Sequence, residues 1–133
     1  MSYQFEFDPI NQILLCRLEG CVTDETATEF YHNAAKLMAR INPRVGVADF
    51  TTVTSFEVSN NTIHTLAASP PAMPDPAMPR FIVAPLPHVF GMSRMFQMLG
   101  EKTRPLLQVV HTLDEVYLAL GVQPAPFAPI DRS

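Results

Sequence analysis

The sequence predicts a single α/β domain in which helices cover a mixed five-stranded sheet. Two observations lead to this fold class. Two strands joined by a short turn stand at the start of the chain, and apolar strands then alternate with amphipathic helices. The expected order is strand, strand, helix, strand, helix, strand, helix, strand, helix, which is typical of a mixed sheet with an antiparallel edge. A chain of 133 residues with 47% hydrophobic content can bury one sizeable core.

The first two strands form the antiparallel edge. Aromatic and polar residues alternate along residues 3–8, as in a strand with one buried face. Residues 9–12 supply a turn, and residues 13–19 give the second strand, which we expect Gly20 to end. Because the connection is so short, the two strands form a hairpin.

An amphipathic helix follows the hairpin. Thr23 is a good N-cap, and Asp24 and Glu25 lie where a carboxylate favours the positive end of the helix dipole. We expect Asn42-Pro43 to end the helix. An apolar stripe at spacings of three and four faces the sheet and consists of Ala27, Phe30, Tyr31, Ala34, Met38 and Ile41.

The middle of the chain contains a central strand and a second helix. Residues 45–50 are apolar without alternation, as in a strand that is covered on both faces. A polar loop then leads to a helix at residues 59–68. Residues 69–79, the proline-rich loop, hold five prolines and repeat Pro-Ala-Met-Pro twice. Proline removes backbone donors, so this segment is expected to be a surface loop without regular structure.

Two further strand and helix pairs complete the domain. Residues 81–84 form an apolar strand, and residues 89–100 form the Met-rich helix. Residues 106–110 form the fifth strand, and a capping box of Thr112 and Glu115 opens the last helix, which Gly121 ends. We therefore expect one domain over residues 1–122 and a Pro-rich tail over residues 123–133.

Composition excludes several classes of function. The net charge is −4, and acidic and basic residues are mixed along the chain, so nucleic acid is not an expected partner. The start of the chain lacks the features of a signal peptide, and no apolar run approaches the roughly 20 residues that span a bilayer. Cys16 and Cys21 are too few for a disulfide scaffold, and Cys16 is expected to be a buried thiol. We expect a cytoplasmic protein.

The sequence contains no recognisable catalytic or metal-binding pattern. The four histidines are scattered, and none combines with cysteine or carboxylate at the spacing of a zinc site. No Gly-x-Ser-x-Gly segment supports a nucleophilic serine. We therefore expect no enzymatic activity, no metal and no cofactor.

Three segments resemble the SpoIIAA-like (STAS-like) proteins of bacteria. Residues 84–96 read Ala-Pro-Leu-Pro-His-Val-Phe-Gly-Met-Ser-Arg-Met-Phe, similar to an uncharacterised branch of that family. The helix start at residues 20–23 and the strand-Thr-Leu-Asp-Glu-helix unit at residues 108–120 also match. The resemblance covers about residues 3–122 and implies a SpoIIAA-like fold.

The resemblance also points to Ser59. In signalling members a strand that ends in Asp leads to an Asp-Ser-Ser-Gly turn, where a kinase phosphorylates a serine. Aligned from Asp49, Ser59 falls at that acceptor position, with Glu57, Val58 and Asn60 in place of the Asp, the first Ser and the Gly. Two interpretations stay open: a plain N-cap, which we favour, and a phosphoacceptor at a helix N-terminus.

The Met-rich helix is the second candidate site. It carries apolar side chains over most of its circumference, more than one buried stripe requires. The side chains either belong to the core or contact a ligand or partner, which flexible Met side chains suit well. Arg94 is either a surface residue or an anion-binding group. The candidate binding residues are Phe90, Met92, Arg94, Met95, Phe96 and Met98.

These observations predict a non-catalytic binding module that acts in signalling through protein contacts. The expected partner is another protein or a second copy of the chain in a homodimer. The alternative is a carrier of a small apolar or lipid-like ligand, held between the Met-rich helix and the proline-rich loop.

Overall fold

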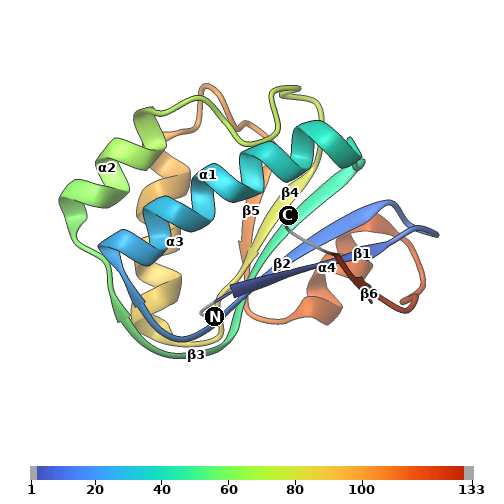
Figure 1. Cartoon of the computed structure of the whole chain (residues 1–133), viewed down its shortest axis with the longest axis horizontal. Coiled ribbons are helices and arrows are strands. Elements are labelled where there is room, and N and C mark those ends of the chain that lie inside the picture. The colour runs from blue at the N-terminus through green and yellow to red at the C-terminus, as the bar shows by residue number, and fades with distance from the viewer. Residues whose placement is uncertain (1–2, 131–133) are drawn as a thin grey trace.

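A six-stranded mixed sheet forms the centre of the protein (Figure 1). The computed structural model describes residues 3–130. The strand order across the sheet is β5-β4-β3-β2-β1-β6. The strands are β1 (Tyr3–Asp8), β2 (Ile13–Thr23), β3 (Val45–Glu57), β4 (Arg80–Val83), β5 (Leu107–Val110) and β6 (Ala128–Pro129).

Three helices cover one face of this sheet and a fourth covers part of the other. The helices are α1 (Asp24–Ile41), α2 (Asn60–Ala68), α3 (Pro87–Leu99) and α4 (Leu113–Leu120). Along β2, Leu14 and Cys16 pack with α1, α2 and α3, whereas Ile13 and Leu15 pack with α4, because successive side chains of a strand point to opposite faces. Figure 1 shows α1, α2 and α3 grouped together, with α4 apart from them at the lower right. None of the helices within residues 3–130 is long and apolar enough to cross a membrane.

The predicted mixed sheet is confirmed. β1 and β2 pair antiparallel, from Tyr3 opposite Leu18 to Asp8 opposite Ile13, as the short turn requires. β2, β3, β4 and β5 pair in parallel. The local helix signals act as expected, since Thr23 caps α1 and the Thr112 and Glu115 capping box opens α4.

The sheet has six strands rather than the five predicted. The sixth, β6, lies within the expected tail and pairs antiparallel with β1, with Phe7 opposite Ala128. The backbone N–H of Ile130 also donates to the carbonyl of Phe5, at 2.9 Å. An extended segment beside an edge strand satisfies that strand's free backbone groups, and Pro129 is tolerated at an outer edge that needs no donor.

β2 and β3 are both longer than predicted. Gly20 does not end β2; it lies within the strand at φ 67, where the register with β3 shifts. The pairing continues to Thr23 opposite Glu57, so residues 51–57 are strand rather than polar loop. A glycine can form a β-bulge, after which the two strands continue to pair. In the sequence alone, such a glycine looks like the end of a strand. Ser59 therefore follows a long central strand.

Candidate functional site

Ser59 caps the N-terminus of α2. Its hydroxyl accepts a hydrogen bond from the backbone N–H of Thr62 at 3.2 Å. Its own backbone N–H donates to the carboxylate of Asp24, at 2.7 Å. This hydrogen bond lowers the pKa of the Asp24 carboxyl below its ordinary value of 3.8, so the group is an anion at neutral pH. A phosphate on Ser59 would gain the helix dipole but would lie near this negative charge.

The N-cap interpretation makes a direct prediction about stability. We expect Ser59→Ala to lower the free energy of unfolding by about 1 kcal/mol, because a donor at the start of α2 loses its acceptor. Ser59→Thr is the matched control and should stay close to the wild-type value, since threonine also caps helices. Urea denaturation of the three proteins measures the difference. An unchanged midpoint in Ser59→Ala would show that the observed cap contributes nothing.

The Met-rich helix, α3, places its candidate residues in three environments. Met92 and Phe96 line a cavity between the helices and the sheet. Met95 is half-buried against the core, and Phe90 stacks on the ring of His111, with 4.2 Å between ring centroids. Met98 points outward and is 66% exposed. The helix therefore faces both an internal cavity and the surface.

The cavity lies in the helical layer and has a volume of about 170 Å³. Its walls come from all four parallel strands, β2, β3, β4 and β5, and from the helices α1, α2 and α3. The turn after α3 and the proline-rich loop, through Ala72 and Met73, complete them. Almost all of the lining side chains are apolar. Cys16 is one of them, and burial raises the pKa of its thiol, so it stays protonated and unreactive. The expectation of a buried thiol agrees with this position.

Two arginines, Arg80 and Arg104, lie at the cavity wall, and the sequence analysis did not identify them as candidate site residues. Arg80 is 7% exposed and Arg104 is 4% exposed. Arg94, which the pattern did reveal, is exposed and does not line the cavity. Arg80 and Arg104 each stand next to a proline at the edge of an apolar segment, a context that carries no signal for burial.

Backbone oxygens hold both buried guanidinium groups. Arg80 donates to the carbonyl oxygens of Met73, Asp75 and Met78 in the proline-rich loop. The partners of Arg104 are more numerous and come from several parts of the chain. They are the carbonyls of Leu66, Ala67 and Ser69 at the end of α2, and the hydroxyls of Tyr31 and Thr103.

Arg80 and Arg104 together bring positive charge to the cavity wall. Within residues 3–130 neither arginine forms an ion pair with a carboxylate. Burial lowers the pKa of Arg80 first, and the positive charge of Arg104 lowers it further, while Asp75 and Tyr31 act in the opposite direction. The Arg104 guanidinium lies 4.7 Å from the centre of the Phe96 ring, which also lines the cavity. One part of an otherwise apolar cavity therefore carries positive charge.

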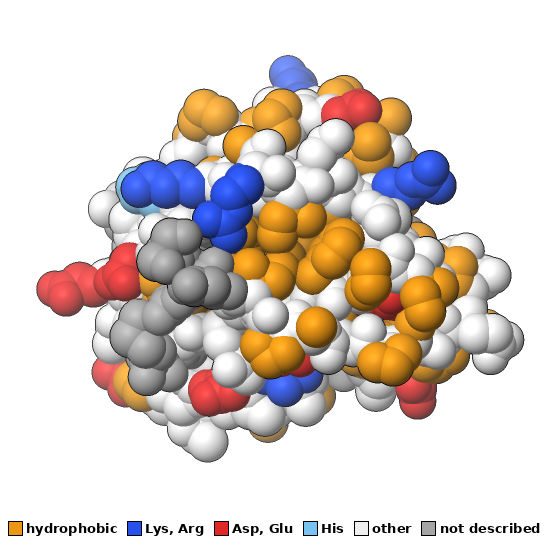
Figure 2. Space-filling model, turned by 45° about the vertical axis from the view of Figure 1, so that its right-hand side comes forward, with side chains coloured by type: hydrophobic (Ala, Val, Ile, Leu, Met, Phe, Trp, Pro, Cys, Tyr) orange, Lys and Arg blue, Asp and Glu red, His pale blue; other side chains and the backbone are white. Residues whose placement is uncertain are grey.

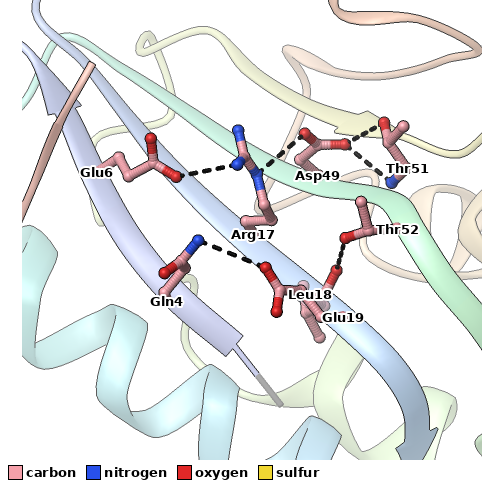
Figure 3. A network of polar contacts seen from close by, with 8 residues as sticks. All are labelled: Gln4, Glu6, Arg17, Leu18, Glu19, Asp49, Thr51 and Thr52. Carbon is pink, nitrogen blue, oxygen red and sulfur yellow. Dashed lines mark hydrogen bonds and ion pairs between the residues drawn. The ribbon is translucent and has the colours of Figure 1, made fainter. Parts of the chain in front are cut away.

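A polar network lies on the opposite face of the sheet, beyond the part that α4 covers (Figure 3). Arg17 of β2 stands between Glu6 of β1, at 3.3 Å, and Asp49 of β3, at 3.9 Å. Asp49 also accepts hydrogen bonds from the backbone and hydroxyl of Thr51. Partly exposed ion pairs of this kind contribute little stability. The network links three neighbouring strands, and we assign it a structural role.

The described part of the chain shows no metal centre. No group of three or more His, Cys, Asp or Glu side chains lies together within residues 3–130. Figure 2 shows one face of the molecule, where hydrophobic side chains gather in the centre. The positive side chains on this face are scattered, with one group beside that centre, and do not form a continuous stripe. Two features of the described residues that can bind another molecule are the cavity and the exposed end of α3.

Comparison with solved structures finds this fold in SpoIIAA. The structure of the anti-sigma factor antagonist SpoIIAA in its unphosphorylated form matches 92% of this chain and 100% of that chain, with a TM-score of 0.60 and 13% identity. The structure of the Bacillus cell fate determinant SpoIIAA in the phosphorylated form matches 90% and 99%, with a TM-score of 0.55 and 15% identity. The chain therefore has the SpoIIAA-like fold that the sequence predicts. No protein-family model and no curated protein matches the sequence.

Proposed function

We propose that the protein is a non-catalytic STAS-like binding module that acts in regulation through contacts with another protein. The observation that carries this proposal is the apolar surface at the end of α3. Met98 is 66% exposed, Leu99 next to it in sequence is 44% exposed, and Leu106, just before β5, is 42% exposed. Gln97 donates to the carbonyl of Leu107 at 2.7 Å, which holds this end of α3 against the start of β5. An exposed apolar group of this kind is typical of a contact surface.

The likeness to SpoIIAA supports the same proposal. One matching structure is described as an anti-sigma factor antagonist, a description that names a protein factor as its target. Fold alone does not transfer a role. The description of that structure names a protein target, and the exposed apolar side chains of α3 suit a protein contact; this agreement supports the proposal. The first partner to test is a second copy of this chain.

We expect Met98→Glu to weaken the protein contact, because a carboxylate in an apolar interface is left without a partner. Sedimentation velocity over a range of concentrations measures the self-association. Leu118→Glu is the control, since Leu118 is 83% exposed and lies on α4, at the other face of the sheet. The wild type and the control should associate alike, and Met98→Glu should shift toward monomer at the same concentration.

If the wild type, Met98→Glu and Leu118→Glu all associate to the same extent, Met98 does not take part in the contact between copies of the chain. Far-UV circular dichroism of Met98→Glu should stay native, since the substituted side chain is on the surface. A loss of secondary structure would mean that Met98 belongs to the core after all.

Ser59 offers a way to regulate such a contact. One of the matching SpoIIAA structures is in a phosphorylated form. Ser59 is exposed, and a phosphate there would add about two negative charges to the start of α2. We favour the N-cap role, because Asp24 already holds the Ser59 backbone N–H. Mass spectrometry of the protein from its native host decides: a gain of one phosphate on Ser59 would overturn that preference.

Carriage of a small apolar ligand is the second candidate function. The observation that favours it is the cavity, since its lining includes both Met92 of α3 and Met73 of the proline-rich loop. An apolar cavity of roughly 150 Å³ is large enough to hold a benzene molecule. Native mass spectrometry of freshly purified protein tests the idea, because a retained ligand adds its mass to the chain.

A further inference from the structure

The cavity wall combines an apolar body with two buried positive charges. Side chains such as Leu18, Ala34 and Ile63 surround most of the 170 Å³ space. Arg80 and Arg104 also reach the lining, and Tyr31 adds a hydroxyl beside them. A purely apolar ligand would require no charge at this wall. Two cations there are a cost to folding unless something compensates them.

Carbonyl oxygens compensate the two charges only in part. A guanidinium group has five N–H donors, and the three hydrogen bonds of Arg80 to Met73, Asp75 and Met78 leave two of its donors free within the described residues. Carbonyl oxygens carry only partial negative charge, and no carboxylate of residues 3–130 pairs with either arginine. The pair therefore retains net positive charge and spare donors.

The two arginines are also close enough to repel each other. The positive charge of Arg104 lowers the pKa of Arg80, so the two groups interact electrostatically. An anion placed between them would be attracted by both charges and would relieve that repulsion. Guanidinium groups suit a carboxylate in particular, because their planar N–H pairs match its two oxygens.

We propose that the cavity binds a small carboxylic acid anion whose apolar body is about the size of a benzene ring. The body fills the apolar space, and the carboxylate lies against Arg80 and Arg104. The inference rests on the second candidate function, ligand carriage, and adds the chemistry of the head group. The competing interpretation is that both arginines serve only to hold the proline-rich loop and the end of α2.

Binding of matched acids and alcohols to the full chain separates these interpretations. The probes are benzoate against benzyl alcohol and hexanoate against hexanol, measured by chemical-shift titration at neutral pH. We expect at least one acid to bind about tenfold tighter than its alcohol, the gain of a charge-assisted pair of hydrogen bonds. If both alcohols bind as tightly as their acids, the head-group inference is wrong but carriage stands. If none of the four probes binds, both the inference and carriage are wrong.

Two variants locate the bound molecule. Ala34→Leu fills part of the cavity and should weaken every probe, whereas Ala39→Leu, the same change at an exposed position of α1, should not. Arg80→Gln should remove the preference for acid over alcohol, whereas Arg44→Gln, at an exposed arginine, should retain it. An acid preference that survives in Arg80→Gln would overturn the assignment. If a variant fails to fold, the comparison of acid with alcohol on the wild type still decides.

Discussion

Replacing Arg104 by methionine is expected to lower the free energy of unfolding by about 3 kcal/mol or more. The change leaves several buried acceptors of Arg104 without donors, and each buried polar group left unpaired costs about 1–3 kcal/mol. Those acceptors lie far apart in sequence: Arg104 reaches the Tyr31 hydroxyl in α1 and the carbonyls of Leu66 and Ala67 at the end of α2. One side chain therefore holds two helices and the turn after α3 together.

The control for this prediction is Arg44→Met. Arg44 is exposed, and a surface substitution usually changes stability by no more than about 0.5 kcal/mol. Urea denaturation of both variants against the wild type measures the difference. If Arg104→Met and Arg44→Met had the same small effect, the hydrogen bonds of Arg104 would not stabilise the helical layer.

Leu18→Ala is expected to cost about 3 to 5 kcal/mol of stability. Leu18 is 1% exposed in β2 and lines the cavity. Truncation removes apolar contacts and enlarges a cavity that already exists, so the neighbours have little ability to close the gap. Leu118→Ala is the same substitution at an exposed position of α4 and should stay within about 0.5 kcal/mol of the wild type.

The enlarged cavity adds a second measurement to this prediction. If Leu18→Ala still folds, it should accept a larger apolar probe than the wild type does, because the cavity gains the volume of the lost side chain. If Leu18→Ala loses little stability and accepts no larger probe than the wild type, the neighbouring side chains have moved to fill the space that Leu18 leaves. Such a result would contradict a cavity held open by the surrounding helices.

Local sequence signals account for most of the fold. The alternation in residues 3–8, the cap at Thr23 and the capping box at Thr112 each depend on a few neighbouring residues, and each appears in the structure as expected. The features that the sequence did not predict, β6 and the extension of β3, depend on distant parts of the chain. β6 pairs with β1 across more than a hundred residues, and the extension of β3 depends on its partner β2. Neither pairing leaves a local pattern.

The candidate site was predictable only in part. The Met-rich helix stood out by its composition, and the structure places two of its candidate residues, Met92 and Phe96, on the cavity. The two buried arginines did not stand out, because their burial depends on distant acceptors. Arg104 and Tyr31 lie 73 positions apart in sequence. A cavity formed where three helices meet a sheet likewise has no signature in any one segment.

Protein contact through the exposed end of α3 is tested most directly by crosslinking in the living cell. A photo-crosslinking amino acid is placed at position 98 in one variant. A control variant carries it at position 118 on α4, which is more exposed than position 98. We expect a covalent adduct with a protein, either a second copy of this chain or another polypeptide, from position 98 and none from position 118. No protein adduct from position 98, or the same adducts from both positions, would contradict the proposed role of this surface.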